Sequence, residues 1–133
     1  LEPFRDVYGF VAGDDVLRFT AMMLGETVDE VGTANDFIGH PGGDNFIVIT
    51  TEAAAPAIRQ RLKDRFAREV LTHYSFIDRE RGYILTRSES GVETRAPLMS
   101  LAVGAVSASQ YRFSDIREIT EMAANARRLD GAG

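Results

Sequence analysis

The sequence feature that most constrains the fold is a glycine turn between two apolar runs. Phe37-Ile38 comes before the stretch Gly39-His40-Pro41-Gly42-Gly43-Asp44-Asn45, and Phe46-Ile47-Val48-Ile49 follows it. Proline fixes one backbone angle, adjacent glycines allow positive φ, and aromatic and β-branched flanks favour extended chain. We therefore predict a β-hairpin over residues 36–50, with Asp44 where the turn becomes a strand.

This turn has two chemical interpretations. Adjacent glycines let a ligand approach bare backbone, and the carboxylate of Asp44 could hold a divalent cation beside a phosphate. Alternatively, Gly42 and Gly43 form a plain turn in which Asp44 bonds to its own local backbone. His40 could likewise contact a phosphate when protonated, but a structural role at the strand end is the simpler interpretation.

Apolar residues recur at helical spacing on both sides of the hairpin. This spacing predicts one helix over residues 14–32 and another over residues 51–70, with Asp14 and Thr51 as N-caps and Gly32 as a stop. The predicted buried positions are Leu17, Ala21, Leu24, Val28 and Val31 in the first helix, and Ala54, Ile58, Leu62, Phe66 and Val70 in the second. Residues 1–13 read as one helical turn followed by a loop. The charges interleaved in the second helix are interpreted as a solvated face.

The C-terminal half reads as strands followed by a helix. The predicted strands are Ser75-Phe76-Ile77, Tyr83-Ile84-Leu85-Thr86, Val92–Arg95 and a buried central strand, Leu98–Val103. Ser114 and Asp115 open a last helix with Arg127-Arg128 near its negative end, and the tail from Asp130 is expected to fray. Its inward positions are Ile116, Ile119, Ala123 and Ala126. Helices that cross between strands predict an α/β domain of the α+β sandwich kind, in which helices pack on a mixed, mostly antiparallel sheet.

Composition narrows the range of functions. A chain of 133 residues with 44% hydrophobic residues can form one domain with one core. A net charge of −5 argues against a broad contact with nucleic acid. The absence of cysteine excludes thiolate metal ligands and a cysteine nucleophile. No apolar run reaches the ~20 residues of a membrane span, so we expect no membrane contact within this chain and a cytoplasmic location.

Three sequence blocks resemble those of a known family. Gly42-Gly43-Asp44-Asn45-Phe46 is similar to the Gly-Gly-Asp/Glu-Glu-Phe motif of GGDEF domains, the bacterial diguanylate cyclases that condense two GTP into cyclic di-GMP. The block Asp6–Leu17 resembles the family's Asn-Asp-x-Tyr/Phe-Gly-His-x-x-Gly-Asp-x-x-Leu segment, and Met99–Ala105 resembles its Thr-x-Ser-x-Gly strand. The blocks occur in the family's order and cover nearly the whole chain.

The resemblance implies a palm-like, nucleotide-cyclase fold. In the family, a strand that carries Asp-x-Asp comes immediately before the segment matched by residues 1–4, and this chain lacks it. We therefore expect residues 1–133 to be a single GGDEF-like domain without its N-terminal strand, and a fragment of a larger signalling protein. The sheet is expected to have an open edge or gap beside Leu98–Val103 and reduced stability.

The resemblance also implies site residues. Asp44 matches the family's metal-binding and catalytic acid, with Mg²⁺ as the cofactor when nucleotide is bound. The implied nucleotide-binding positions are Gly42, Gly43, Asp14, Arg5, Phe10 and Arg127. Five positions depart from the family pattern: Asn45 replaces Glu, Arg5 replaces Asn, Phe10 replaces His, Arg127 replaces Lys, and Thr33 replaces the arginine of an Arg-x-x-Asp product-inhibition motif at residues 33–36.

These departures predict a degenerate, catalytically inactive GGDEF domain that acts in regulation, nucleotide sensing or dimerisation. Two alternatives remain open: an active diguanylate cyclase, and a pure protein-interaction module with an empty pocket. The expected partners are GTP or a related guanine nucleotide, a second copy of the chain, or other domains of the same protein.

Overall fold

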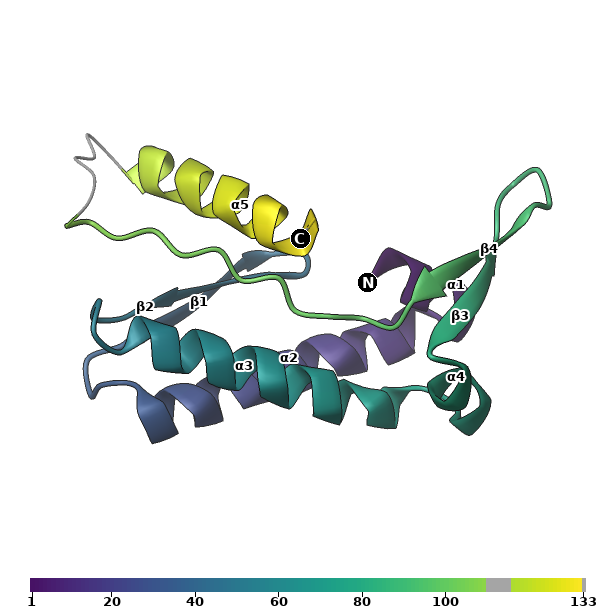
Figure 1. The fold of residues 1–133 in the computed structure, drawn as a ribbon, viewed down its shortest axis with the longest axis horizontal. Helices are drawn as coiled ribbons and strands as arrows, with labels where there is room; N and C mark the ends of the chain where they lie inside the picture. The colour runs from purple at the N-terminus through teal and green to yellow at the C-terminus, as the bar shows by residue number, and fades with distance from the viewer. Residues whose placement is uncertain (110–115, 133) are drawn as a thin grey trace.

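The computed structural model of the chain describes residues 1–109 and 116–132. The elements follow the order α1 (Glu2–Tyr8), α2 (Phe10–Val31), β1 (Phe37–Gly42), β2 (Asn45–Ile49), α3 (Ala55–Glu69), the short 3₁₀ helix η1 (Val70–His73), α4 (Phe76–Arg81), β3 (Tyr83–Arg87), β4 (Glu93–Pro97) and α5 (Ile116–Ala132) (Figure 1).

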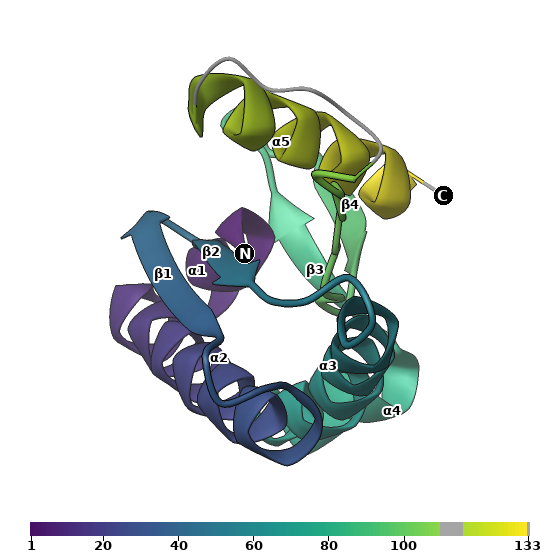
Figure 2. The same cartoon turned by 90° about the vertical axis from the view of Figure 1, so that its left-hand side faces the viewer.

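The elements are arranged in layers. Helices α2 and α3 lie side by side and form one layer, and α5 lies on the opposite side of the molecule (Figures 1 and 2). The β1–β2 and β3–β4 hairpins lie between these layers toward opposite ends, and each forms a separate two-stranded antiparallel sheet. The predicted α+β class, with antiparallel strands and packed helices, is confirmed.

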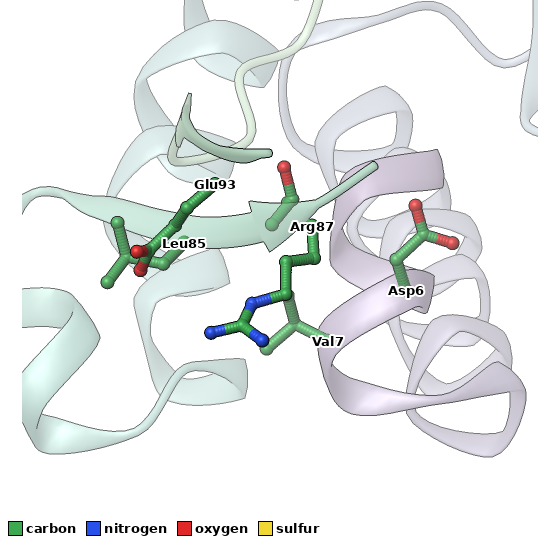
Figure 3. A pocket seen from close by; sticks show the side chains of 6 residues that line it. Asp6, Val7, Leu85, Arg87 and Glu93 are labelled. Atoms are coloured by element: carbon green, nitrogen blue, oxygen red, sulfur yellow. The ribbon is translucent and has the colours of Figure 1, made fainter. Parts of the chain in front are cut away.

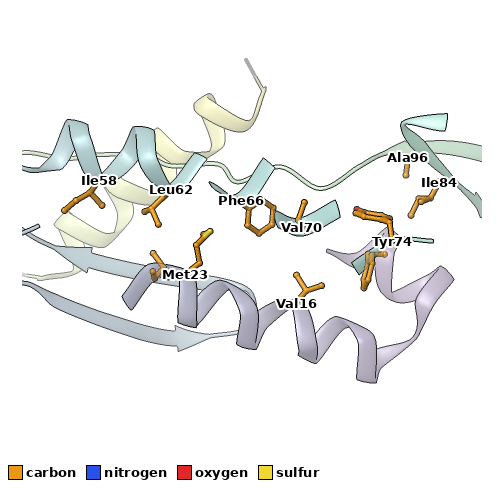
Figure 4. Close-up of a cluster of buried hydrophobic side chains, with 11 residues drawn as sticks. Val16, Met23, Ile58, Leu62, Phe66, Val70, Tyr74, Ile84 and Ala96 are labelled. Atoms are coloured by element: carbon orange, nitrogen blue, oxygen red, sulfur yellow. The ribbon is translucent and has the colours of Figure 1, made fainter. Parts of the chain in front are cut away.

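A single apolar cluster connects α1, α2, α3, η1 and the β3–β4 hairpin (Figure 4). Its buried members are Phe4, Val16, Met23, Leu24, Ile58, Leu62, Phe66, Val70, Tyr74, Ile84 and Ala96. At one end, the Phe4 ring stacks on Tyr8 with centroids 4.7 Å apart and meets Tyr74 edge-on at 5.3 Å. Burial of this apolar surface is the main stabilising contribution to the fold.

Helix α2 begins earlier than its sequence pattern predicts. Gly9, with φ of 93°, separates α1 from α2, and the helix starts at Phe10. Asp14 therefore lies inside the helix, and its prediction as the N-cap was wrong. The buried face is correspondingly different, because α2 packs on α3 through Val16, Thr20, Met23, Leu24, Thr27 and Val28, while Leu17 is only half-buried and Ala21 is exposed. The predicted stop at Gly32 is confirmed.

The central hairpin forms as predicted. Phe37 pairs with Ile49, Ile38 with Val48, and Gly42 with Asn45 across the turn.

Four of the predicted positions in the next helix, Ile58, Leu62, Phe66 and Val70, are buried, and Ala54 is half-buried. Thr51 is not its N-cap, because α3 begins at Ala55. The hydroxyl of Thr51 instead accepts a hydrogen bond from the Ala54 N–H at 3.2 Å and closes the preceding turn.

The predicted strand Ser75-Phe76-Ile77 was wrong, since these residues begin α4. The Ser75 hydroxyl accepts a hydrogen bond from the Asp78 N–H at 3.2 Å, and Gly82 ends the helix in the left-handed region with φ of 79°. Both are standard helix-capping features, Ser75 at the N-terminus and Gly82 at the C-terminus of α4. Phe76 and Ile77 are consequently exposed, whereas a buried strand would have covered alternate side chains.

The second hairpin, β3–β4, is confirmed, and its second strand covers Glu93–Pro97 where Val92–Arg95 was predicted. The predicted strand Leu98–Val103 was wrong, because these residues are extended but paired with no strand in the described part of the chain. Side chains satisfy two of its backbone donors: the Met99 N–H donates to the Tyr74 hydroxyl and the Val103 N–H to the Asp130 carboxylate, each at 2.8 Å. An apolar run thus covers the core without joining a sheet.

The last helix is confirmed in type, although its predicted opening residues, Ser114 and Asp115, lie outside the described residues. The prediction that the tail frays from Asp130 was wrong: α5 continues to Ala132 because Asp130 forms ion pairs with Arg59 at 2.5 Å and Lys63 at 2.6 Å. The charges of α3 are therefore more than a solvated face. Within residues 1–109 and 116–132, no helix is long and apolar enough to cross a membrane.

Candidate functional site

The turn of the first hairpin has the backbone geometry that its glycines predict. Gly42 and Gly43 have φ of 147° and 58°, so both adopt positive values. A Cβ added at either glycine would meet nothing within 4 Å, which means that conformation and not space requires glycine here. Asp44 is exposed and makes no hydrogen bond or ion pair with the described residues. The turn thus presents open backbone and one free carboxylate.

Asn45, the fourth residue of the Gly-Gly-Asp-Asn-Phe motif, is hydrogen-bonded by a residue of α5. The Oδ1 atom of Asn45 accepts a hydrogen bond from Nη1 of Arg127 at 2.5 Å, across 82 residues of sequence. Both residues were predicted as site positions, and the structure brings them into direct contact. The guanidinium of Arg127 forms no ion pair with a carboxylate in the described part of the chain.

Two neighbours hold α5 close enough for this contact. A Cβ built at Gly104 would overlap the backbone nitrogen of Arg127 and lie 2.6 Å from the carbonyl carbon of Ala126, so the missing side chain allows α5 to approach residues 98–106. One turn after Arg127, Asp130 joins α5 to α3 and to Val103.

The Asp130 carboxylate is an unusually strong acid. Hydrogen bonds from Lys63 and from the Val103 N–H, together with the positive charges of Lys63 and Arg59, lower its pKa to about 2. The carboxylate is therefore ionised at neutral pH and keeps its ion pairs.

A second group of predicted residues lies at the start of α2. Arg5 packs its stem over Gly13, because a Cβ added at Gly13 would lie 2.8 Å from Arg5 Cγ. Asp14 follows on the exposed surface of the helix, and Phe10 exposes 77% of its surface. Arg5 and the Gly13-Asp14 pair are thus neighbours. No hydrogen bond or ion pair among the described residues joins this group to the hairpin turn.

The segment that matches the family's product-inhibition motif forms a structural turn. The Asp36 carboxylate accepts hydrogen bonds from the Thr33 N–H at 2.7 Å, from the Thr33 hydroxyl, and from the Thr50 hydroxyl at 2.8 Å. The Thr33 hydrogen bonds, and then that of Thr50, lower the pKa of Asp36. Asp36 therefore connects the end of α2 to the open end of the hairpin.

His40 supports the hairpin from within. Its ring stacks on Phe46 with centroids 4.4 Å apart, and its Nε2–H donates to the Gly43 carbonyl oxygen at 2.8 Å. These contacts favour the structural interpretation of His40 over a phosphate contact.

The residues that the structure describes do not form a complete Mg²⁺ site. Magnesium requires near-octahedral oxygen ligands, usually with one or two carboxylates. Asp44 supplies one carboxylate, and the oxygen of Asn45 already faces the positive charge of Arg127. Residues 1–109 and 116–132 contain no group of three or more His, Cys, Asp or Glu side chains that could hold a metal ion.

An open depression of about 300 Å³ lies between α1 and the β3–β4 hairpin (Figure 3). Arg87 extends from β3 toward Val7 of α1, with Asp6, Leu85 and Glu93 around it. Sequence reasoning did not select these residues, although Asp6 belongs to the block that resembles the family segment. Sequence reasoning also missed Gly104 and Asp130 as positioning residues, and the signal for Gly104 was its place in the third block.

Comparison with protein families gives one match. The family model described as "Diguanylate cyclase, GGDEF domain" matches residues 1–126. No curated protein and no solved structure matches the chain.

Proposed function

The chain belongs to the GGDEF domain family of diguanylate cyclases, and from that premise we propose that it is a degenerate member that does not synthesise cyclic di-GMP. It acts in the regulation of a bacterial signalling protein, by sensing a guanine nucleotide or by dimerising. The observation that carries this proposal is the hydrogen bond between Asn45 and Arg127.

The chemistry of cyclisation explains why the residue in that hydrogen bond, Asn45, matters for activity. A 3′-hydroxyl must lose its proton and the developing charge on a triphosphate must be neutralised, which carboxylate-bound metal ions can do. The amide of Asn45 has no charge and cannot act as a base. Arg127, which stands where the family has Lys, donates to this amide, so the position offers no carboxylate to bind a cation or accept a proton.

The positions at the start of α2 support the same conclusion. An arginine side chain offers hydrogen-bond donors but no acceptor, so Arg5 cannot reproduce the paired donor and acceptor of the family's Asn. Phe10 presents an exposed apolar ring where the family has an imidazole. Neither residue offers the polar groups of the family's pocket.

The direct test is incubation of the chain with GTP and Mg²⁺, followed by chromatographic detection of cyclic di-GMP. We expect no product above a heat-denatured control. The Asn45→Glu variant, which restores the family's acid, serves as a matched comparison and should also give none, because Arg5 and Phe10 remain. Product from the unaltered chain would overturn the proposal and establish an active cyclase.

A second candidate function, a protein-interaction module, is favoured by exposed apolar side chains. The Ser75 N–H donates to the Tyr8 hydroxyl at 3.0 Å, which brings the start of α4 close to the junction of α1 and α2. Large apolar residues are exposed on both sides of this contact: Phe10 and Val11 (77% each), Phe76 (68%) and Ile77 (67%). Exposed apolar surface of this kind marks interaction sites.

Two measurements separate the candidates. Calorimetric titration with GTP detects nucleotide sensing, and light scattering detects self-association of the chain and of its Phe10→Ser and Phe76→Ser variants. Nucleotide binding by a monomer supports sensing. Self-association that either substitution abolishes, without nucleotide binding, supports the interaction module.

A further inference from the structure

We propose that two copies of the chain associate by pairing their β3 strands edge to edge, around a two-fold axis at Leu85. This inference rests on the proposed function, since it names the surface and the contacts through which the chain dimerises. The surface belongs to the second hairpin and includes none of the implied nucleotide-binding positions.

One edge of β3 is unpaired. The Ser88 N–H donates to the Val92 carbonyl oxygen at 3.0 Å across the turn of the hairpin. Because hydrogen-bonded pairs alternate along an antiparallel ladder, every second residue back from Ser88 bonds to β4. The β3 residues between these positions direct their N–H and C=O groups away from β4, and they are Tyr83, Leu85 and Arg87. In the described part of the chain, no strand pairs with this edge.

The free edge lies in an open and apolar part of the surface. The depression of about 300 Å³ beside α1 is lined by the consecutive β3 residues 85–87, so it follows the edge of the strand (Figure 3). Helices α1 and α4 both contact β3. Of the eleven large apolar side chains exposed among the described residues, seven lie on α1, the start of α2, α4 and this hairpin: Val7, Phe10, Val11, Phe76, Ile77, Leu85 and Val92. An unpaired edge within apolar surface favours association.

A second copy of β3 fits this edge in register. In an antiparallel pair centred on Leu85, each Leu85 lies opposite the Leu85 of the other copy, and Tyr83 lies opposite Arg87. The outward N–H and C=O groups of all three residues then face outward groups of the other strand, as hydrogen-bonded pairs require. The central pair is apolar, and the outer pairs place no like charges opposite each other. The edge is therefore complementary to itself.

The other edge of the hairpin opposes the same arrangement. By the same alternation, the outward residues of β4 are Glu93, Arg95 and Pro97. Pro97 has no N–H to donate, and a two-fold pair centred on Arg95 would place two guanidinium groups opposite each other. The comparison within one hairpin therefore selects β3 as the self-pairing strand.

Cysteine cross-linking tests the register, because the chain contains no cysteine of its own. In Leu85→Cys, the two introduced residues would be directly opposed with Cα atoms about 5.5 Å apart, which a disulfide can span. Arg95→Cys is the matched control, since Arg95 lies opposite Leu85 on β4 and both β3 strands would separate it from its counterpart. Under mild oxidation, we expect Leu85→Cys to form a linked dimer about tenfold faster or more. Equal rates would overturn the proposal.

Sedimentation equilibrium tests the association itself, at about 0.5 mM chain because so small an interface binds weakly. We expect a monomer–dimer equilibrium that Leu85→Lys abolishes, since it places two ammonium groups opposite each other. Val92→Lys is the control, because it adds the same charge to an exposed apolar position of the hairpin outside the β3 edge, and should change the dissociation constant less than about twofold. A monomeric unaltered chain, or equal losses in both variants that retain their circular dichroism, would overturn the proposal.

The outcomes also separate this proposal from the proposed function. Cyclic di-GMP formed by the unaltered chain would contradict the loss of synthesis, whatever its state of association. A monomeric chain would contradict the strand pairing and leave the absence of synthesis unaffected, because Leu85 stands at no implied site position. Self-association that Phe76→Ser abolishes and Leu85→Lys retains would overturn the assignment to β3 and place the contact on α4.

Discussion

The α2–α3 core and the pair formed by the β1–β2 hairpin and α5 differ in how much they rely on apolar burial and how much on polar contacts. Eight of the eleven buried side chains of the apolar cluster come from α1, α2, α3 and η1, and none comes from β1, β2 or the described part of α5. From the hairpin, Ile38, Phe46 and Val48 pack against this cluster but are only partly buried. Polar contacts add to this packing, such as Asn45 with Arg127 and Asp130 with Lys63.

This difference separates stability from function. Apolar burial is nondirectional and tolerates changes of detail, whereas a hydrogen bond between distant residues requires accurate placement of both. The candidate site depends on such a hydrogen bond, between Asn45 and Arg127, so its geometry can change at small cost in global stability. The predictions below test this comparison, from the largest expected effect to the smallest.

The largest effect is expected from Phe66→Ala in the core. Phe66 is 5% exposed and packs near Phe19, and such truncations cost about 3–5 kcal/mol of unfolding free energy. Urea denaturation measures the loss. Phe37→Ala removes the same side chain from the hairpin, where it is 58% exposed, and should change stability by less than about 0.5 kcal/mol. Equal losses would contradict the contrast between the two regions.

Gly104→Ala should have the next largest effect, because the added Cβ would overlap the backbone of α5 at Arg127. We expect a loss toward the upper end of the ~1–3 kcal/mol that overpacking costs, with faster amide exchange in α5. Gly25→Ala in α2 is the control, since its Cβ meets nothing within 4 Å, and it should stabilise the chain by about 0.5–1 kcal/mol. Unchanged exchange in α5 would show that Gly104 does not set the position of the helix.

Gly42→Ala tests the backbone of the turn. With φ of 147°, this residue adopts a conformation that other residues avoid, and we expect a loss of about 1–2 kcal/mol by thermal unfolding. Gly43→Asn should be nearly neutral, because φ of 58° lies in the left-handed region that asparagine tolerates. A larger loss at Gly43 than at Gly42 would show that the turn adopts another geometry in solution.

The smallest effect on stability is expected from titration of Asp130. Its pKa of about 2 in the folded chain lies below its usual value of 3.8, so its contribution is fully present above pH 4 and is lost as the pH falls toward 2. Asp130→Asn should lose this pH dependence and should weaken the protection of α5 from amide exchange. An unfolding curve between pH 4 and pH 2 that is the same in both chains would rule out the carboxylate as the anchor of α5.

The central hairpin, the α3 helix and the β3–β4 hairpin could be predicted from sequence because their signals are local. Gly42 and Gly43 allow the turn, and apolar residues every fourth position from Ile58 to Val70 form one helical face. The family could be recognised for a similar reason, since its three motifs are short runs of residues. The departures at Arg5, Phe10 and Asn45 were also visible in the sequence.

The tertiary structure decided everything that depends on contacts between distant residues. Ser75–Ile77 has the composition of a strand, but capping by Ser75 and the contact between Tyr8 and Asp78 place it in a helix. Leu98–Val103 is apolar enough for a central strand, yet no described strand pairs with it and side chains take two of its donors. Strand formation needs a partner, which local sequence does not specify.

The sequence by itself determined which residues stand at the motif positions, because identity at a position is a local property. It did not determine that Arg127 would contact Asn45, or that the absence of a side chain at Gly104 would let α5 approach. Nor did it determine that Asp130 would anchor the C-terminal end of α5, which was predicted to fray. Those contacts join residues at least 19 positions apart. Their formation depends on how the packed helices orient the chain as a whole, and only the tertiary structure contains that information.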